Sequence, residues 1–194
     1  HLSIRRQRQM CIRDRLSLDA YLDKTRIPLK IDISTGDVIT PCEISFSYQL
    51  MFENRTIPLL AYPPETVLAE KLETILSRGE ANTRLRDFYD VYILQREDFV
   101  VTPDALCHAL LATCRKRGHE DLLHTYASIL DRVRQSDTMR TQWMKYQSDF
   151  DYAAGITWDT VLDTVETLCM KTLDDHAFGD ELPQEESQFE MHLL

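Results

Sequence analysis

The amino-acid sequence predicts an α+β fold in which a small sheet is followed by a mostly α-helical region. Before residue 62, apolar and polar side chains alternate in short stretches, which is the period of half-buried strands. After residue 62, apolar side chains recur at helical spacing in segments bounded by proline, glycine and threonine. The chain has 194 residues, of which 43% are hydrophobic, so it is long and apolar enough to bury a core.

Charge and cysteine content limit the classes of protein to which the chain can belong. The net charge of -10 argues against a protein that coats nucleic acid through overall basicity, although a local basic groove is compatible with it. The five cysteines include no Cys-x-x-Cys pair, which favours reduced thiols over a disulfide framework or a zinc site. No apolar run approaches the roughly 20 residues that span a bilayer. We therefore expect a soluble, cytoplasmic protein that makes no contact with a membrane.

The two ends of the chain differ in composition from the part between them. Residues 1–15 are cationic and lack periodicity, and residues 9–15, QMCIRDR, resemble the translation of a sequencing adapter. We predict that residues 1–15 are non-native or disordered and that the gene is cut off upstream; an arginine-rich nucleic-acid arm is the alternative. Residues 174–194 are acidic and have little to bury, so they are predicted to be a disordered tail.

Three stretches before residue 62 are candidates for strands. Residues 27–34 alternate, with apolar side chains on one side and Asp32 on the open face. Residues 44–52 and 56–61 are expected to pair as a hairpin. Residues 16–23 are amphipathic but short, and the pattern leaves open whether they end a helix or a strand.

A pair of short helices between residues 63 and 94 is the richest part of the sequence in charged side chains at ordered spacing. Lys71 and Arg78 share one polar face of the first helix at i and i+7, and Gly79 ends that helix. Asp87 and Asp90 lie at i and i+3 in the second helix. Two carboxylates beside a lysine are found in Mg-triphosphate sites and in ion-pair networks, and the spacing alone favours the network.

The remaining chain is predicted to be helical. Thr102 and Thr157 are placed to cap two of the helices, and further helices are expected at 120–134 and 138–147. Trp143 and Trp158 are expected to pack in the core. A basic loop is predicted around Gly118, and it accounts for the neighbouring basic side chains Arg115, Arg117 and His119.

Two sequence motifs resemble the AbiEii/AbiGii toxin family of nucleotidyltransferases. AEKLETILSRGEANTRLRDFYDVY is similar to the family's paired helix signature, and the upstream PLKIDISTGDVITP is similar to its K-x-D strand. The resemblance implies a polymerase-beta-like nucleotidyltransferase fold, of which residues 16–100 would form the C-terminal part of the catalytic core, a partial sheet with the signature helix pair. Residues 101–173 would then form a helical domain.

The resemblance also implies roles for individual residues. Asp32 would be a metal-binding carboxylate, Lys71 and Arg78 would contact nucleotide phosphates, and Asp32, Lys71, Asp87 and Asp90 would form the catalytic set. The implied reaction is Mg-dependent transfer of a nucleotide from an NTP to an RNA acceptor, with tRNA as one candidate. The implied biological setting is a toxin-antitoxin or abortive-infection system, with a cognate antitoxin as partner.

One departure from the family pattern affects the expected activity. The Gly-rich element and the D-x-D pair that the family carries before the K-x-D strand have no counterpart in this sequence. We therefore expect this chain to be a truncated and nearly inactive fragment of an active enzyme. The alternative is a helical module that binds a nucleotide or a partner without catalysis.

Overall fold

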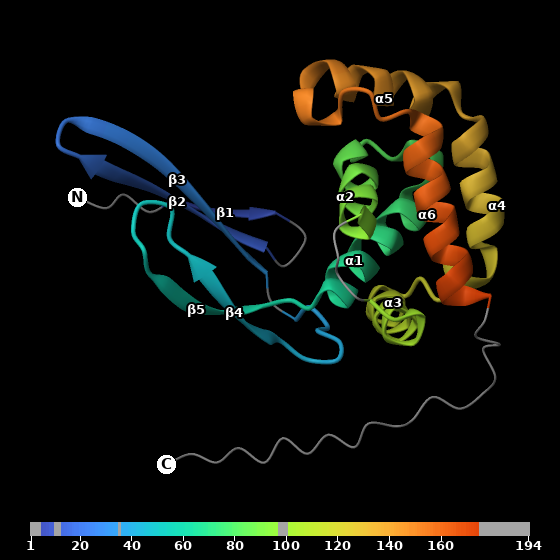
Figure 1. Ribbon diagram of the computed structural model, residues 1–194, viewed down its shortest axis with the longest axis horizontal. Helices are drawn as coiled ribbons and strands as arrows, with labels where there is room; N and C mark the ends of the chain where they lie inside the picture. The colour runs from blue at the N-terminus through green and yellow to red at the C-terminus, as the bar shows by residue number, and fades with distance from the viewer. Residues whose placement is uncertain (1–4, 10–12, 35, 97–100, 175–194) are drawn as a thin grey trace, which may run out of the picture.

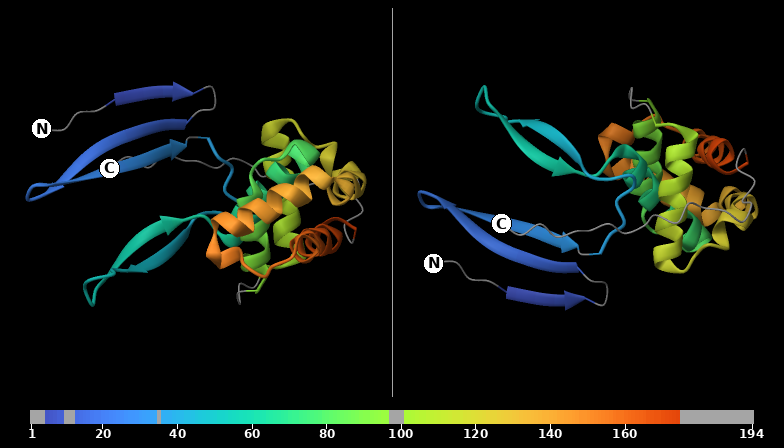
Figure 2. Two further views of the ribbon diagram at one scale, coloured as in Figure 1. Left: turned by 90° about the horizontal axis from the view of Figure 1, so that it is seen from above. Right: turned by 90° about the horizontal axis from the view of Figure 1, so that it is seen from below.

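The computed structural model describes residues 5–9, 13–34, 36–96 and 101–174. Within these residues, two small antiparallel sheets come first and six α-helices follow, which confirms the predicted α+β class. The strands project from one side of the helical bundle, as the views in Figures 1 and 2 show. The predicted acidic tail lies outside the described residues apart from Asp174.

The first sheet is an antiparallel meander in the order β1-β2-β3. Its strands are β1 (Arg5–Gln9), β2 (Arg13–Leu22) and β3 (Thr25–Ser34). The strand predicted at 27–34 is thereby confirmed, and the stretch 16–23, which the pattern left open, is a strand. Residues 5–9 and 13–15 also lie in strands although the sequence there shows no alternation, because ladder hydrogen bonds join backbone groups and do not require a side-chain pattern.

The second sheet is the predicted hairpin, formed by β4 (Ile44–Gln49) and β5 (Thr56–Ala61). The Leu50 amide donates to the Arg55 carbonyl at 3.0 Å and so closes the loop. Pro58 lies in a sheet of two strands, where each strand is an edge and a missing amide donor is tolerated.

Hydrogen bonds tie the segment between β3 and β4 to residues at and just before the start of α1. The Thr66 hydroxyl accepts from the Thr40 amide at 2.9 Å and donates to the Thr40 carbonyl at 3.0 Å. The Tyr62 hydroxyl donates to the Asp37 carboxylate at 2.9 Å. Thr66 is fully buried, so this junction is part of the folded core.

The helices form a bundle around α1, which packs most extensively against α2 and α3. The predicted caps at two helix starts are confirmed, since the Thr102 and Thr157 hydroxyls accept from the amides of Ala105 and Thr160 at 3.3 and 3.1 Å. The helical elements are α1 (Pro64–Arg78), η1 (Gly79–Ala81), α2 (Leu85–Arg96), α3 (Pro103–Arg117), α4 (Leu122–Gln135), α5 (Asp137–Asp149), η2 (Asp151–Ala153) and α6 (Trp158–Leu173).

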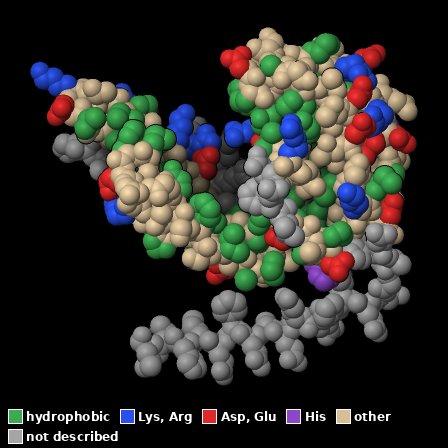
Figure 3. Space-filling model, in the orientation of Figure 1, with side chains coloured by type: hydrophobic (Ala, Val, Ile, Leu, Met, Phe, Trp, Pro, Cys, Tyr) green, Lys and Arg blue, Asp and Glu red, His purple; other side chains and the backbone are tan. Residues whose placement is uncertain are grey.

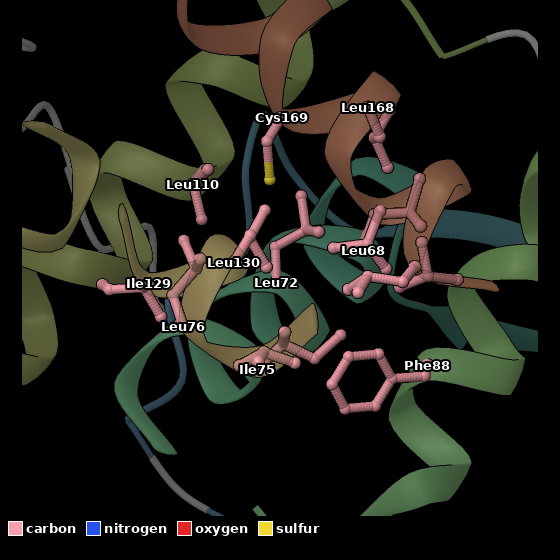
Figure 4. Close-up of a cluster of buried hydrophobic side chains, with 14 of the residues drawn as sticks. Leu68, Leu72, Ile75, Leu76, Phe88, Leu110, Ile129, Leu130, Leu168 and Cys169 are labelled. Atoms are coloured by element: carbon pink, nitrogen blue, oxygen red, sulfur yellow. The ribbon is translucent and has the colours of Figure 1, made fainter. Parts of the chain in front are cut away.

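The hydrophobic core lies inside this bundle. Leu68, Leu72 and Ile75 of α1 are fully buried and face side chains from α2, α3, α4 and α6 (Figure 4). Burial of each such side chain contributes roughly 1.5–3 kcal/mol. Trp143 and Trp158 pack in the core as predicted, at 1% and 3% exposure. In the part of the chain that the structure describes, no helix combines the length and apolar character needed to cross a bilayer.

Candidate functional site

The structure brings Lys71 of α1 together with both aspartates of α2. The Lys71 Nζ lies 2.5 Å from Asp90 Oδ2 and 3.5 Å from Asp87 Oδ1. The side chains are 18% exposed for Lys71, 3% for Asp87 and 23% for Asp90. The ammonium group is therefore held between two carboxylates, and only Asp90 and Lys71 retain appreciable contact with solvent.

The turn between α1 and α2 places these side chains opposite one another. Gly79 ends α1 with a φ of +50°, a left-handed value that favours glycine. After η1, the buried Asn82 accepts a hydrogen bond from the Arg84 amide through Oδ1 at 2.8 Å. This side-chain bond satisfies an amide at the start of α2 and fixes where that helix begins.

Arg84, which directly precedes α2, and Arg86 of α2 complete the ion-pair network. Arg84 Nε lies 2.8 Å from Asp87 Oδ2. The i,i+3 spacing of the two residues was the signal that could have predicted this pair. Arg86 Nε lies 3.7 Å from Asp90 Oδ1 at i,i+4 spacing, which is a longer contact than that of Asp90 with Lys71.

A pocket of about 740 Å³ opens beside this network. Its wall from α1 and α2 includes Lys71, Asp87 and Asp90, and the opposite wall comes from α5, which lies next to α2 in Figure 1. The cationic side chains in the lining are Lys71, Arg84, Arg86 and Lys145, against the carboxylates of Asp87, Asp90 and Asp149. The lining thus carries four positive and three negative groups in a chain of net charge -10, so it is a locally basic site on an acidic protein.

The α5 wall was not predicted from the sequence. Gln142, Lys145, Tyr146 and Phe150 line it, more than forty residues after the helix pair, and no local pattern connects them with Lys71. Burial and the hydrogen bond with Tyr152 raise the pKa of Tyr146 above its ordinary value. Tyr146 therefore contributes a neutral hydroxyl to the pocket over the physiological pH range.

Two of the predicted site residues lie elsewhere. Asp32 of β3 pairs with Arg15 of β2, its cross-strand neighbour, through Nε at 2.5 Å and Nη2 at 2.8 Å, and it does not line the pocket. Arg78 is exposed in the last turn of α1 and is also absent from the lining. Lys71, Asp87 and Asp90 therefore form one site, whereas Asp32 and Arg78 do not join it in this structure.

The described residues do not supply a complete metal site. Among them, no group of three His, Cys, Asp or Glu side chains is arranged to hold a metal ion. Oxygens of Asp87 and Asp90 face the Lys71 ammonium group, which would repel a divalent cation placed between them. The donor arrangement around Lys71 is thus that of an ammonium site.

A second ion-pair cluster lies on another side of α1. The Arg117 guanidinium pairs with the carboxylates of Glu70 and Glu73, and His119 Nδ1 lies 2.6 Å from Glu73 Oε1. Arg117 is the last residue of α3, and His119 lies in the predicted loop around Gly118. Both side chains contact the carboxylate of Glu73, which is 2% exposed. These side chains join the end of α3 to α1, and the long separation along the chain explains why local sequence patterns missed them.

Comparison with known proteins identifies a matching family. A family model described as "Nucleotidyl transferase AbiEii toxin, Type IV TA system" matches residues 6–164. No curated protein and no solved structure matches the chain. The matched range begins in β1 and ends within α6, so it includes the strands, the helix pair and the α5 wall of the pocket.

Proposed function

Because the chain belongs to the family of AbiEii nucleotidyl transferase toxins of type IV toxin-antitoxin systems, we propose that its pocket binds the triphosphate of an NTP for transfer of the nucleotide to an RNA acceptor. A tRNA is one candidate acceptor. The observation that carries this proposal is the Lys71 ammonium group, held between two carboxylates in the lining of a locally basic pocket.

Lys71 is suited to bind a phosphate. Nucleotidyl transfer moves negative charge onto the leaving pyrophosphate, and fixed cations stabilise that charge. Arg84 and Arg86 line the same pocket with side chains 47% and 76% exposed, so they can turn toward a bound triphosphate. Lys145 adds a cation from the facing wall.

The two aspartates are suited to different roles. Asp87 is almost completely buried and contacts both Lys71 and Arg84, so it would orient these cations. Asp90 is more exposed and would be available as a base that accepts the proton of the attacking hydroxyl. Binding of a triphosphate to Lys71 would weaken the pair between Lys71 and Asp90 and leave the carboxylate free for that role.

Mg²⁺ enters this proposal with the NTP. In nucleotide sites, Mg²⁺ keeps several waters and is bound largely through substrate phosphates. The described residues offer no complete ligand set of their own, and the predicted metal ligand Asp32 lies outside the pocket. The mechanism proposed for this chain is therefore confined to phosphate binding, orientation and proton transfer.

The biological setting follows from the family. A type IV toxin-antitoxin system pairs the toxin with an antitoxin, so a cognate antitoxin is the expected partner. NTPs and RNA are both cytoplasmic, and we place the reaction in the cytoplasm for that reason.

The proposal is tested by substitution of Lys71. We expect Lys71→Met to weaken binding of Mg-NTP at least tenfold by calorimetry, because the variant keeps the length of the side chain and removes its charge. Lys171→Met, at an exposed position on α6, is the matched control and should bind as the unmodified chain does. Thermal unfolding of both variants checks that they are folded.

Transfer of labelled nucleotide to total RNA is measured beside binding. Only weak transfer is expected from this chain, because its sequence lacks the D-x-D pair of the family. Unchanged NTP affinity in Lys71→Met would exclude the pocket as the triphosphate site. Detectable transfer that is lost in Lys71→Met would favour the enzyme over the non-catalytic nucleotide-binding module.

A further inference from the structure

Aromatic rings gather at the end of α5, beside the proposed triphosphate site. Phe150 lies 4.7 Å from Tyr146 and 5.3 Å from Tyr152, measured between ring centroids. Tyr152 in turn lies 4.8 Å from Tyr89 of α2. Trp143, at the centre of the bundle, is 1% exposed, whereas Phe150 and Tyr152 are 42% and 51% exposed. The outer rings of this aromatic group therefore keep a surface that the core does not cover.

Phe150 is the ring that faces both this group and the pocket. It lines the pocket together with Tyr146 and Lys71. The ring remains 42% exposed to solvent. A flat ligand that stacked on it would remove this apolar surface from water. Packing of the bundle does not require that exposed face.

Gln142 supplies a polar group one helical turn before Tyr146. It lines the same wall, and its Oε1 is buried without a hydrogen-bond partner in the part of the chain that the structure describes. Rotation of the amide by 180° exchanges its oxygen and nitrogen, so Gln142 can present either an acceptor or a donor at this place. A buried amide oxygen without a partner favours a ligand that donates a hydrogen bond to it.

We infer that Gln142 and Phe150 form a nucleobase site, which holds the base of the NTP whose triphosphate binds Lys71. The inference rests on the proposed function and extends it to the part of the substrate that distinguishes one NTP from another. A stacking face and an amide at its edge are the two features with which proteins hold a single nucleobase. An apolar ligand would leave Gln142 without a partner, and a phosphate group would gain nothing from the ring.

The test separates the base from the phosphates of the ligand. Binding of ATP, CTP, GTP and UTP is compared with binding of inorganic tripolyphosphate, each with Mg²⁺, for the full chain and for Phe150→Ala, Phe150→Tyr and Gln142→Leu. Phe52→Ala is the matched control, because Phe52 is 93% exposed in the loop between β4 and β5 and does not line the pocket.

Loss of the stacking ring should weaken NTP binding without affecting the phosphates. We expect Phe150→Ala to lower NTP affinity about tenfold and to leave tripolyphosphate affinity unchanged, while Phe150→Tyr restores NTP binding. Gln142→Leu should bring the four NTP affinities closer together. Equal loss of NTP and tripolyphosphate binding in Phe150→Ala would overturn the inference, because the ring would then act through packing alone.

Failure of this inference can be told apart from failure of the proposed function. If NTPs and tripolyphosphate bind with equal affinity and both depend on Lys71, the triphosphate site stands and the nucleobase site is excluded. A short RNA oligonucleotide is tested as a second source of bases. If the chain binds this RNA through Phe150 but binds no NTP, the assignment of the base to the NTP is overturned together with the triphosphate site.

Discussion

The two parts of the molecule bury their side chains very differently. We call the described residues before Pro64 the strand half and those from Pro64 onward the helical half. The hydrophobic core begins with Leu68 and lies in the helical half, and Pro63 is the only buried residue among those of the strand half whose burial the structure describes. The strand half instead exposes the apolar side of β3, where Ile27, Leu29 and Ile31 are 41%, 45% and 47% exposed.

The strands of this chain form by backbone pairing, whereas the free energy that stabilises the fold comes mainly from apolar burial in the helical half. A sheet of two or three strands with one bare face gains little free energy from burial. Figure 3 shows hydrophobic side chains spread over the surface of the strand half. The helical half has the core, and it also has the pocket, so the rigidity that the site needs is available where the site lies.

The largest effect is expected from truncation of an aromatic core side chain. Phe88 is fully buried with its ring centroid 5.1 Å from that of Trp158, and Phe88→Ala should lower the free energy of unfolding by about 3–5 kcal/mol. Phe46→Ala in the hairpin, at 51% exposure, should change it by no more than about 0.5 kcal/mol. Chemical denaturation of both variants checks the comparison. Equal losses would mean that the hairpin is packed as tightly as the bundle.

A smaller effect is expected from the ion pairs. Glu73→Gln removes the charged partner of Arg117 and His119, and we expect a loss of about 1–3 kcal/mol because Glu73 is 2% exposed. Glu53→Gln in the strand half breaks the pair with Arg55, whose side chains are both about 60% exposed, and should cost less than about 1 kcal/mol. Denaturant unfolding measures both. A larger loss in Glu53→Gln would contradict the contrast between the two halves.

The two halves are also expected to differ in the reactivity of their cysteine thiols. Of the three comparisons, this one has the smallest effect on stability. Cys42 of the strand half is exposed, and Cys107, Cys114 and Cys169 of the helical half are buried. In a Cys11→Ser background at pH 8, one thiol should react quickly with a disulfide reagent and three should react only after unfolding. Fast reaction of more than one thiol in the native protein would show that the bundle opens readily.

The buried thiols also give a direction for the effect of pH. Burial raises the pKa of Cys114 and of Cys169 to about 12, from about 9.0 for a free thiol. The unfolded chain therefore releases these protons at lower pH than the folded chain. Their contribution to stability is complete below pH 9 and is lost as the pH rises from 9 toward 12, which unfolding at a series of alkaline pH values would measure.

Local signals in the sequence were sufficient for most of the helical half. Thr102 and Thr157 cap helices where their position before the apolar pattern predicted it, and Trp143 and Trp158 lie in the core. Each of these features depends on residues within a few positions of one another. Long-range pairs carry no such signal, and the contact of Arg117 with Glu73 was missed for that reason.

The candidate site was predicted only on the side formed by the helix pair. Lys71, Asp87 and Asp90 are close in sequence and in space, so helical spacing and family resemblance could select them. Gln142 lies on α5 and Phe150 directly follows that helix. The packing of α5 against α2 is a tertiary contact, and no spacing rule identifies the two residues. The expected place of Asp32 in the catalytic set stays a prediction, since in this structure it lies outside the pocket.

Four consecutive residues of α1 contact their surroundings in three directions. Glu70 and Glu73 pair with Arg117 of α3, Lys71 pairs with the aspartates of α2, and Leu72 is fully buried in the core. A rotation of α1 about its axis, or a slip along it, would break all of these contacts together. These contacts together fix the rotation of α1 and its position along its axis. The position of the ammonium group in the pocket therefore depends on residues that do not line the pocket.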